Sequence, residues 1–386
     1  MRPLDLVVVG LGAAGSATLF QAARRGARVL GIDRHRPPHE QGSSHGESRI
    51  TRQAIGEGLD YVPLALRAHE LWREIEAETG EALFVQTGAL MIAPPGLGAA
   101  HHGIAGFFER TLEAARAFDI VHETLTAAEV RRRWPHFRVS EAEGAYFEPG
   151  AGLVRPEAAI AAQLRLATGL GAEIRTGETV LAVDPVVGGV RVTTEQGAYV
   201  AARAVVCAGA WIPVLVGESW ADRLSLYRQA MHWFEPAEPA VFAPDRTPVF
   251  IWMYGEGEGD WFYGFPRDPA LGGVKIASEQ WSQTATTPEA IDRVVTRDEA
   301  LALHARHVDG RIKGLPARWL RSRACLYTCA PQSRFMIGEE GPGVIVVSAC
   351  SGHGFKHSPA IGEAVAAWAL SGERPDVLAP FDLVAI

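Results

Sequence analysis

The segment Leu6–Asp33, LVVVGLGAAGSATLFQAARRGARVLGID, decides the fold of this chain. It begins with an apolar, β-branched run, Val7–Val9, which predicts a short buried strand. Gly10, Gly12 and Gly15 follow in G-x-G-x-x-G spacing, where a helix of small residues starts. The first glycine allows a tight turn, the second lets a pyrophosphate approach the backbone, and the third lets the helix pack closely. The helix N-terminus offers free N–H groups to phosphates.

The second half of this segment completes a strand–helix–strand unit. The helix ends at Gly26, and the apolar run Val29–Ile32 predicts the next strand. Asp33 ends that strand, roughly 20 residues after Gly10, where a carboxylate can accept hydrogen bonds from a ribose. Incidental glycines in an ordinary strand–helix unit are the alternative, but the full context favours a nucleotide site. The segment therefore predicts that the chain binds an adenine dinucleotide.

Composition limits the classes of protein to which the chain can belong. Its 386 residues suffice for two domains or one large composite, and 47% hydrophobic and 21% charged residues are ordinary for a globular chain. A formal net charge of −8 argues against a general binder of nucleic acid or of anionic membranes. No apolar run predicts a membrane span. The four cysteines lack zinc-binding spacing and are too few for a disulfide framework, so we expect a cytoplasmic protein and no metal site.

Periodicity and turn residues predict several further elements. Apolar residues on one face indicate a helix over Tyr61–Thr79, and Phe84–Ile92 predicts two short strands separated by a turn. We expect further helices over Ala99–Arg116 and Ala127–Arg133. The pair His101–His102 has no third candidate ligand nearby in sequence, so we place it at the surface.

The strand-and-turn pattern of the first segment returns twice. VVCAGAW (Val205–Trp211) ends a predicted buried strand on a small-residue turn that contains Gly209. Near the C-terminus, the strand Gly343–Ala349 is followed by the turn CSGHGFK (Cys350–Lys356) and a helix. A nucleotide domain in several pieces argues against a simple NAD-dependent dehydrogenase with one contiguous Rossmann half.

Positive charge is concentrated at a few positions of this acidic chain. His45, Arg49 and Arg52 lie in the loop after Asp33, where a solvated loop and a cofactor contact are equally compatible with the pattern. The chain has only three lysines, Lys275, Lys313 and Lys356. Chance retention at the surface is a fair alternative for any one of them, but a rare lysine also suits a site that needs a titratable ammonium. Lys356 follows a strand-to-helix turn, where open α/β sheets place their ligands.

Five motifs carry a resemblance to a known family. In order, they are GSSHGESRITRQAIGEGLDYVPLALRAHELW (Gly42–Trp72), YGFP (Tyr263–Pro266), GGVK (Gly272–Lys275), CLYT (Cys325–Thr328) and SGHGFK (Ser351–Lys356). Their order and spacing resemble the monomeric sarcosine oxidase / N-methyltryptophan oxidase family of FAD-dependent amine oxidases. The resemblance covers nearly the whole chain.

The resemblance implies an α/β fold with two interleaved domains. A glutathione-reductase-like, Rossmann-type FAD-binding domain would comprise residues 1–82, 147–219 and 321–386. An α+β substrate domain, built on a large mixed or antiparallel sheet, would comprise residues 83–146 and 220–320.

The resemblance also implies how FAD is held. The adenosine ribose would lie on Asp33, and Cys325 would carry the flavin through a thioether to the isoalloxazine 8α-methyl group. His45 and Arg49 would lie beside the flavin, where positive charge favours the reduced ring. The predicted cofactor-binding residues are Gly10, Gly12, Gly15, Asp33, Ser44, His45, Arg49, Cys325, Gly209, Gly352, Gly354, Phe355 and Lys356.

Substrate and oxygen would meet the flavin through a second set of residues. Arg52 and Lys356 resemble the pair that clamps the substrate carboxylate, and Tyr263 resembles a tyrosine of the substrate pocket. Lys275 resembles a cationic lysine that assists O₂ reduction on the opposite flavin face. The predicted catalytic residues are therefore Lys275, Arg49, His45 and Tyr263, and the predicted substrate-binding residues are Arg52, Lys356, Tyr263 and Glu279.

Glu279 departs from the family pattern. Family members with sarcosine activity have a histidine four residues after the lysine that matches Lys275, whereas this chain has Glu279. A carboxylate there would repel a second acidic group and favour a neutral, aromatic or basic side chain. Sarcosine is therefore in doubt as the preferred substrate. The motif after CLYT and the position of Gly338 also differ from the family, and both positions could alter flavin contacts.

We predict an FAD-dependent oxidase of secondary amino acids, with N-methyl amino acids and O₂ as its partners. Hydride would pass to flavin N5, the imine would hydrolyse to aldehyde and amine, and O₂ would be reduced to H₂O₂. An oxidase of a cyclic imino acid or sugar-amine conjugate, and a flavin dehydrogenase with another acceptor, remain alternatives. A non-catalytic FAD-binding or tRNA-modifying protein is less compatible with the acidic charge. We expect a monomer.

Overall fold

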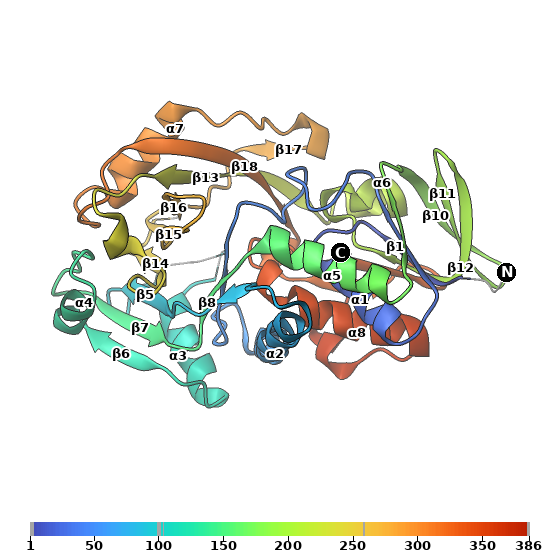
Figure 1. The fold of residues 1–386 in the computed structure, drawn as a ribbon, viewed down its shortest axis with the longest axis horizontal. Helices are drawn as coiled ribbons and strands as arrows, with labels where there is room; N and C mark the ends of the chain where they lie inside the picture. Colours follow the sequence, from blue (N-terminus) through green and yellow to red (C-terminus); the bar gives the residue numbers. More distant parts are fainter. Residues whose placement is uncertain (1–3, 99–101, 103, 258, 384–386) are drawn as a thin grey trace.

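Two large β-sheets organise the part of the chain that the structure describes. The computed structural model describes residues 4–98, 102, 104–257 and 259–383. Figure 1 shows the first sheet, with β1 and β12, on the right and the second sheet, with β13 and β18, on the left. The chain crosses repeatedly from one part to the other, so segments distant in sequence share each sheet.

The first sheet contains the predicted nucleotide unit. Its strand order is β10-β11-β12-β1-β2-β9, with β20 beside β12 and β19 beside β20. Strands β20, β12, β1, β2 and β9 are parallel, whereas β10, β11 and β12 form a meander. Its strands are β1 (Leu4–Val9), β2 (Val29–Asp33), β9 (Glu173–Thr176), β10 (Val180–Val186), β11 (Gly189–Thr194), β12 (Gly197–Val206), β19 (Met336–Glu339) and β20 (Val344–Ser348).

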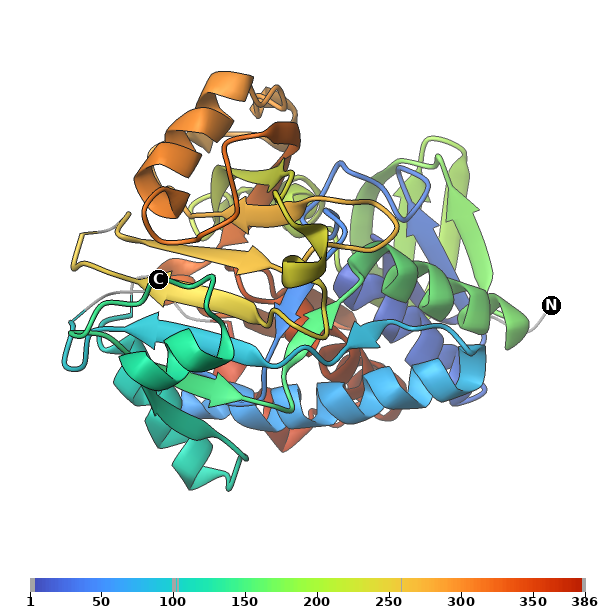
Figure 2. The ribbon, with the colours of Figure 1, turned by 60° about the vertical axis from the view of Figure 1, so that its left-hand side comes forward.

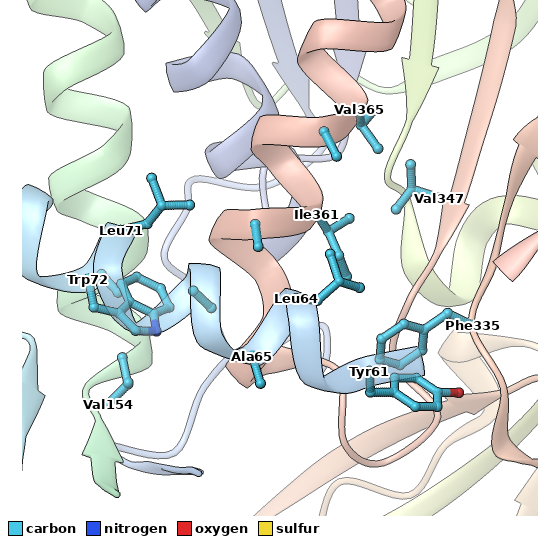
Figure 3. Close-up of a cluster of buried hydrophobic side chains, with 14 of the residues drawn as sticks. Tyr61, Leu64, Ala65, Leu71, Trp72, Val154, Phe335, Val347, Ile361 and Val365 are labelled. Atoms are coloured by element: carbon cyan, nitrogen blue, oxygen red, sulfur yellow. The ribbon is translucent and has the colours of Figure 1, made fainter. Parts of the chain in front are cut away.

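Helices from three regions of the sequence pack beside this sheet. α1 (Ala13–Arg24) contacts both α5 (Pro156–Gly169) and α8 (Ser358–Ser371), and α2 (Val62–Thr79) contacts α8. The α1–α8 approach is close, because a Cβ at Gly362 would lie 2.4 Å from the Ala17 Cβ. Figure 3 shows the apolar face of α2, with Leu64 and Leu71, beside Ile361 of α8. The short helix α6 (Ile212–Val216) follows β12.

The second sheet has the strand order β17-β13-β16-β15-β14-β5-β7-β6, with β18 paired to β13. The pairings are antiparallel except for β5 with β14. Figure 2 shows the yellow strands β14 and β15 of this sheet between the orange helix α7 and the blue strand β5. The strands are β5 (Ala89–Ala93), β6 (Glu123–Thr126), β7 (Gly144–Glu148), β13 (Ser225–Phe234), β14 (Val249–Met253), β15 (Trp261–Phe265), β16 (Val274–Ala277), β17 (Thr284–Ala285) and β18 (Trp319–Cys329).

Smaller elements connect the two parts. A three-stranded sheet joins β3 (Arg49–Thr51), β8 (Gly152–Val154) and β4 (Phe84–Val85), and it brings the predicted basic loop beside the second sheet. The remaining α-helices of the described residues are α3 (Phe107–Ala117), α4 (Ala127–Arg133) and α7 (Arg297–Leu303). Among the described residues, no helix has both the length and the apolar character of a membrane span.

The fold class, an α/β protein with large mixed sheets, is confirmed, and most predicted elements are present. The helix predicted over Ala99–Arg116 begins only at Phe107, and residues 99–101 and 103 lie outside the described part. The predicted domain boundary at residue 321 falls inside β18, which pairs with β13 along its length. The exact division of the chain into two domains therefore stays a prediction.

Candidate active site

A cavity of about 300 Å³ lies along the boundary between the two large sheets. One part of its lining comes from the β1–α1 turn and the end of β2, and another from β14, β15, β16 and β18 of the second sheet. The turns after β12 and β20 line it as well. The cavity therefore joins all three of the glycine-containing turns that the sequence predicts.

The β1–α1 turn has the backbone geometry that its glycines predict. Gly10 has a φ of +84°, and a Cβ there would lie 2.7 Å from the Cys207 carbonyl oxygen. A Cβ at Gly12 would meet only the Ser44 hydroxyl, at 3.5 Å, so this glycine leaves its backbone open towards the cavity. Gly15 does not line the cavity; a Cβ there would lie 1.8 Å from the Gly10 carbonyl oxygen. Gly15 therefore allows the close start of α1.

The N-terminus of α1 suits an anion. Its first turn has no acidic residue, and its N-cap, Gly12, supplies no side chain. The Ala13 N–H donates to Ser44 Oγ at 3.2 Å, and both Gly12 and Ser44 line the cavity. The positive end of the helix dipole thus faces a space that a pyrophosphate can enter.

Asp33 lies at the end of β2 and lines the same cavity. Its Oδ2 accepts the Leu11 N–H at 2.8 Å, and its Oδ1 accepts the His35 N–H at 2.7 Å. The carboxylate therefore holds the two turns together. Each carboxylate oxygen can accept a further donor, which is compatible with the predicted ribose contact.

The two later turns also approach the cavity with their backbones. Gly209 and Gly352 line it with φ values of +54° and +80°, and a Cβ at Gly354 would lie 1.6 Å from the Ala349 carbonyl oxygen. Phe355 lines the cavity and stacks on Trp72 at a ring separation of 6.0 Å. The predicted cofactor-binding residues of these two turns therefore all line the same cavity.

Arg49 and Cys325 meet at the other end of the cavity. Arg49 Nη2 lies 3.5 Å from Cys325 Sγ and donates to the Ser43 carbonyl oxygen at 2.9 Å. Burial raises the pKa of the Cys325 thiol, and Arg49 opposes that effect. Cys325 lines the cavity, whereas Cys329, on the same strand, does not. Cys325 is thus the better placed of these two thiols for a contact with a bound group.

Lys275 is buried beside this cluster. Its Nζ donates to the Gly46 carbonyl oxygen at 2.9 Å and to that of Ser48, and it lies 3.8 Å from the centre of the Phe265 ring. Burial, assisted by the nearby Arg49, lowers the pKa of Lys275 well below its usual range. Burial at this position therefore disfavours the ammonium, whereas a negative partner in the cavity would favour it.

His45 differs from the prediction of a charged residue beside the flavin. It is buried but does not line the cavity, and neither ring nitrogen has a hydrogen-bond partner among the described residues. Burial and the neighbouring Arg49 lower the pKa of His45 to about 3. These observations argue against a charged His45 and place its ring outside the cavity lining.

Arg52 and Lys356 lie together, as predicted, but a carboxylate that the sequence analysis missed separates them. Glu57 Oε2 lies 2.7 Å from Arg52 Nη2, and Glu57 Oε1 lies 3.7 Å from Lys356 Nζ. Burial alone would raise the pKa of Glu57, but Arg52 and Lys356 hold it well below its usual range. Burial lowers the pKa of Lys356 to about 8, against the opposing effect of Glu57. The only sequence signal for Glu57 is that an acidic residue occurs in a loop rich in basic residues.

The surface position that we predict for His102 is wrong, and its neighbour His101 lies outside the described residues. His102 is 6% exposed, with Nε2 2.9 Å from Glu279 Oε1 and Nδ1 3.3 Å from Glu57 Oε1. Burial disfavours the imidazolium, but Glu279 and Glu57 outweigh it and raise the pKa of His102 to about 9. No local pattern marks this residue, because its partners lie far away in sequence.

Glu279, Tyr263 and Trp261 line the cavity next to this network. Burial raises the pKa of Tyr263, and the carboxylate of Glu279 adds to that effect. Tyr327, the tyrosine of the CLYT motif, also lines this part of the cavity, although the sequence analysis gives it no role. The arrangement combines cations, two carboxylates, aromatic side chains and a thiol in the lining of one cavity.

Comparison with known proteins gives the family to which this site belongs. A family model described as DAO, FAD dependent oxidoreductase, matches residues 5–368. The chain belongs to this family of FAD-dependent oxidoreductases. A monomeric sarcosine oxidase of Streptomyces avermitilis is 40% identical over 98% of this chain and 96% of its own length. An N-methyl-L-tryptophan oxidase of Salmonella dublin is 34% identical over 98% of both chains.

Solved structures agree with this assignment. The structure of NikD, described as an unusual amino acid oxidase essential for nikkomycin biosynthesis, has a TM-score of 0.85 and 25% sequence identity. The match covers 99% of this chain and 98% of that one. The predicted family resemblance is therefore confirmed, and the protein is a flavin-dependent oxidoreductase.

The cavity of this FAD-dependent oxidoreductase fits its family's cofactor. The open backbone at Gly12, the acid-free first turn of α1 and the carboxylate of Asp33 suit the pyrophosphate and the ribose. The far end offers Arg49 and Cys325. Bound FAD supplies an acceptor for two electrons, and the surrounding side chains position its partners.

Proposed function

We propose that the protein oxidises secondary amino acids, with N-methyl amino acids as the substrate class. An N-methyl amino acid, O₂ and water would give the primary amino acid, formaldehyde and H₂O₂. The observation that carries this proposal is the pair Arg52 and Lys356, buried in the same cavity as Arg49, Lys275 and Cys325. The printed names of the relatives, a sarcosine oxidase and an N-methyl-L-tryptophan oxidase, support it.

Arg52 and Lys356 would bind the substrate carboxylate. Glu57 neutralises one of the two positive charges, so this trio keeps a net charge that one carboxylate can balance. The Arg52 guanidinium is held in place, because Nη1 donates to the Ala54 carbonyl oxygen at 2.6 Å. A fixed guanidinium and a nearby ammonium would orient the amine without reorganisation of the site.

Two further residues would act at the flavin end. Lys275 would stabilise negative charge as O₂ is reduced, from a position fixed by two backbone carbonyl groups. Cys325 would form a thioether to the isoalloxazine 8α-methyl carbon, and the two electrons released in that step would pass to O₂. The exposure of Cys325, rather than Cys329, to the cavity supports this choice.

We also propose that the enzyme works as a monomer in the cytoplasm.

A substrate panel tests the proposed function. The FAD-loaded protein would be incubated in air with sarcosine, N-methyl-L-alanine and N-methyl-L-tryptophan, and with the matching primary amino acids. We expect H₂O₂ and formaldehyde in equal amounts from at least one N-methyl compound and neither product from its primary counterpart. Oxidation of primary amino acids alone, with release of ammonia, would contradict the proposal.

A further inference from the structure

One carboxylate oxygen of Glu279, Oε2, accepts no hydrogen bond from the described residues. It follows β16, its residue is 5% exposed, and its side chain lines the cavity. Oε1 accepts from His102 Nε2 at 2.9 Å, whereas Oε2 is buried without a hydrogen-bond partner among the described residues. A buried acceptor without a donor is costly, so a donor on a bound ligand is the natural partner of Oε2.

The neighbouring polar side chain of Gln229 cannot supply this donor. Its Nε2 donates to the Gln280 carbonyl oxygen at 2.8 Å, and its Oε1 accepts the Gln280 N–H at 3.1 Å. Both ends of this amide are therefore engaged with the backbone. Gln229 lines the cavity with Glu279 but makes no hydrogen bond to Oε2.

Basic and acidic side chains of the pocket alternate from Arg52 and Lys356 to Glu279. Arg52 and Lys356 surround Glu57, His102 lies between Glu57 and Glu279, and Glu279 ends the series. If the substrate carboxylate binds Arg52 and Lys356, the imidazolium of His102 lies between this carboxylate and Oε2 of Glu279. The acceptor is thus separate from the carboxylate site, and a group other than the carboxylate must reach it.

We propose that Oε2 of Glu279 selects substrates whose side chain ends in an N–H donor, with an ammonium group as the strongest case. The inference rests on the proposed function, and it adds the substrate class that this pocket prefers. Nα-methyl-L-ornithine has such a terminus, whereas Nα-methyl-L-norleucine has the same length and ends in a methyl group. A charge-assisted bond to Oε2 would favour the ornithine compound by about 10- to 100-fold.

The replacement Glu279→Gln removes this preference by a defined route. The His102 imidazolium donates through Nε2, so the amide oxygen of a glutamine would turn towards it. The amide NH₂ would then face the cavity, so a hydrogen-bond donor would stand where the wild type has the acceptor Oε2. Glu238→Gln is the matched control, because it removes one carboxylate from an exposed position outside the cavity.

Two readouts on the FAD-loaded protein test the inference. The first is kcat/KM for the two N-methyl compounds, and the second is the Kd of unmethylated L-ornithine and L-norleucine by calorimetry, which needs no turnover. We expect wild type and Glu238→Gln to prefer the ornithine compound in both assays. Glu279→Gln should lose this preference and keep its affinity for norleucine within about threefold.

Each other outcome overturns a particular statement. Equal affinity of the wild type for both amino acids, a preference that survives Glu279→Gln, or equal weakening of both ligands would overturn the role of Oε2. If the wild type binds neither L-ornithine nor L-norleucine, the role of Oε2 is overturned as well. If the wild type binds ornithine preferentially but oxidises no N-methyl compound, the proposed function fails while the binding preference stands.

Discussion

Glu57 Oε2 lies 2.7 Å from Arg52 Nη2, with both side chains almost fully buried. The same carboxylate also lies within 4 Å of His102 Nδ1 and Lys356 Nζ. One buried carboxylate thus lies within 4 Å of three basic side chains. This arrangement explains how the proposed carboxylate-binding pair, Arg52 and Lys356, can be buried before a substrate binds.

Replacement of Glu57 should therefore destabilise the protein. Glu57→Gln leaves Arg52 buried without its countercharge, and we expect a loss of about 3–5 kcal/mol in the free energy of unfolding. Urea denaturation measures this loss, and Glu373→Gln, at an exposed position, is the control. A carboxylate ligand should stabilise Glu57→Gln more than it stabilises the wild type. A loss below about 1 kcal/mol would show that the ion pair is not strongly coupled to folding.

His102 should make stability dependent on pH. Its pKa in the folded protein is raised to about 9 from 6.5, so its extra stabilisation is complete below pH 6.5 and is lost as pH rises through 9. The shift corresponds to roughly 3 kcal/mol. The difference in unfolding free energy between wild type and His102→Gln should therefore shrink from pH 6 to pH 10. A difference that stays constant over this range would refute a charged His102.

Lys275 should affect the reaction with O₂ and not the reaction with substrate. Lys275→Met removes the amine that Gly46 and Ser48 hold beside Arg49, so reoxidation of the reduced flavin should slow by about 10²-fold or more. Anaerobic reduction by substrate should change little. Stopped-flow absorbance separates the two steps, and Lys313→Met removes an exposed lysine as the control. Unchanged reoxidation in Lys275→Met would exclude the proposed role.

Cys325 should decide whether the flavin is covalently attached. After acid precipitation, we expect the yellow colour in the pellet for wild type and for Cys329→Ser, but in the supernatant for Cys325→Ser. The reason is that Cys325 lines the cavity while Cys329 does not. Colour in the supernatant for the wild type would mean that FAD is held without a covalent bond, and the fold assignment would be unaffected.

The parts of this structure that the sequence predicts are those set by local backbone requirements. The turn at Gly10–Gly15 and the acid Asp33 are close in sequence. Gly10 has a positive φ, and a Cβ at Gly15 would lie 1.8 Å from the Gly10 carbonyl oxygen. Helix α2 follows from apolar spacing along one continuous segment. The family resemblance added the flavin, the amine and the pairing of Arg52 with Lys356.

The network around His102 could not be predicted in this way. Glu57, His102 and Glu279 are distant in sequence, and only the folded chain brings the three together. The sequence shows Glu279 as a carboxylate that would repel acids, whereas the structure pairs one of its oxygens with His102. The placement of β18 in the second sheet likewise depends on its pairing with β13, which local propensity does not encode.

The most direct test of the central claim is anaerobic mixing of the FAD-loaded protein with N-methyl amino acids, followed by flavin absorbance. We expect the flavin of the wild type to be bleached by at least one N-methyl amino acid and to regain its colour in air. Lys356→Met should slow this reduction by about 10²-fold at low substrate, because the carboxylate loses a buried cation. A wild-type flavin that stays oxidised with every secondary amino acid, yet is reduced by amines without a carboxylate, would contradict the account.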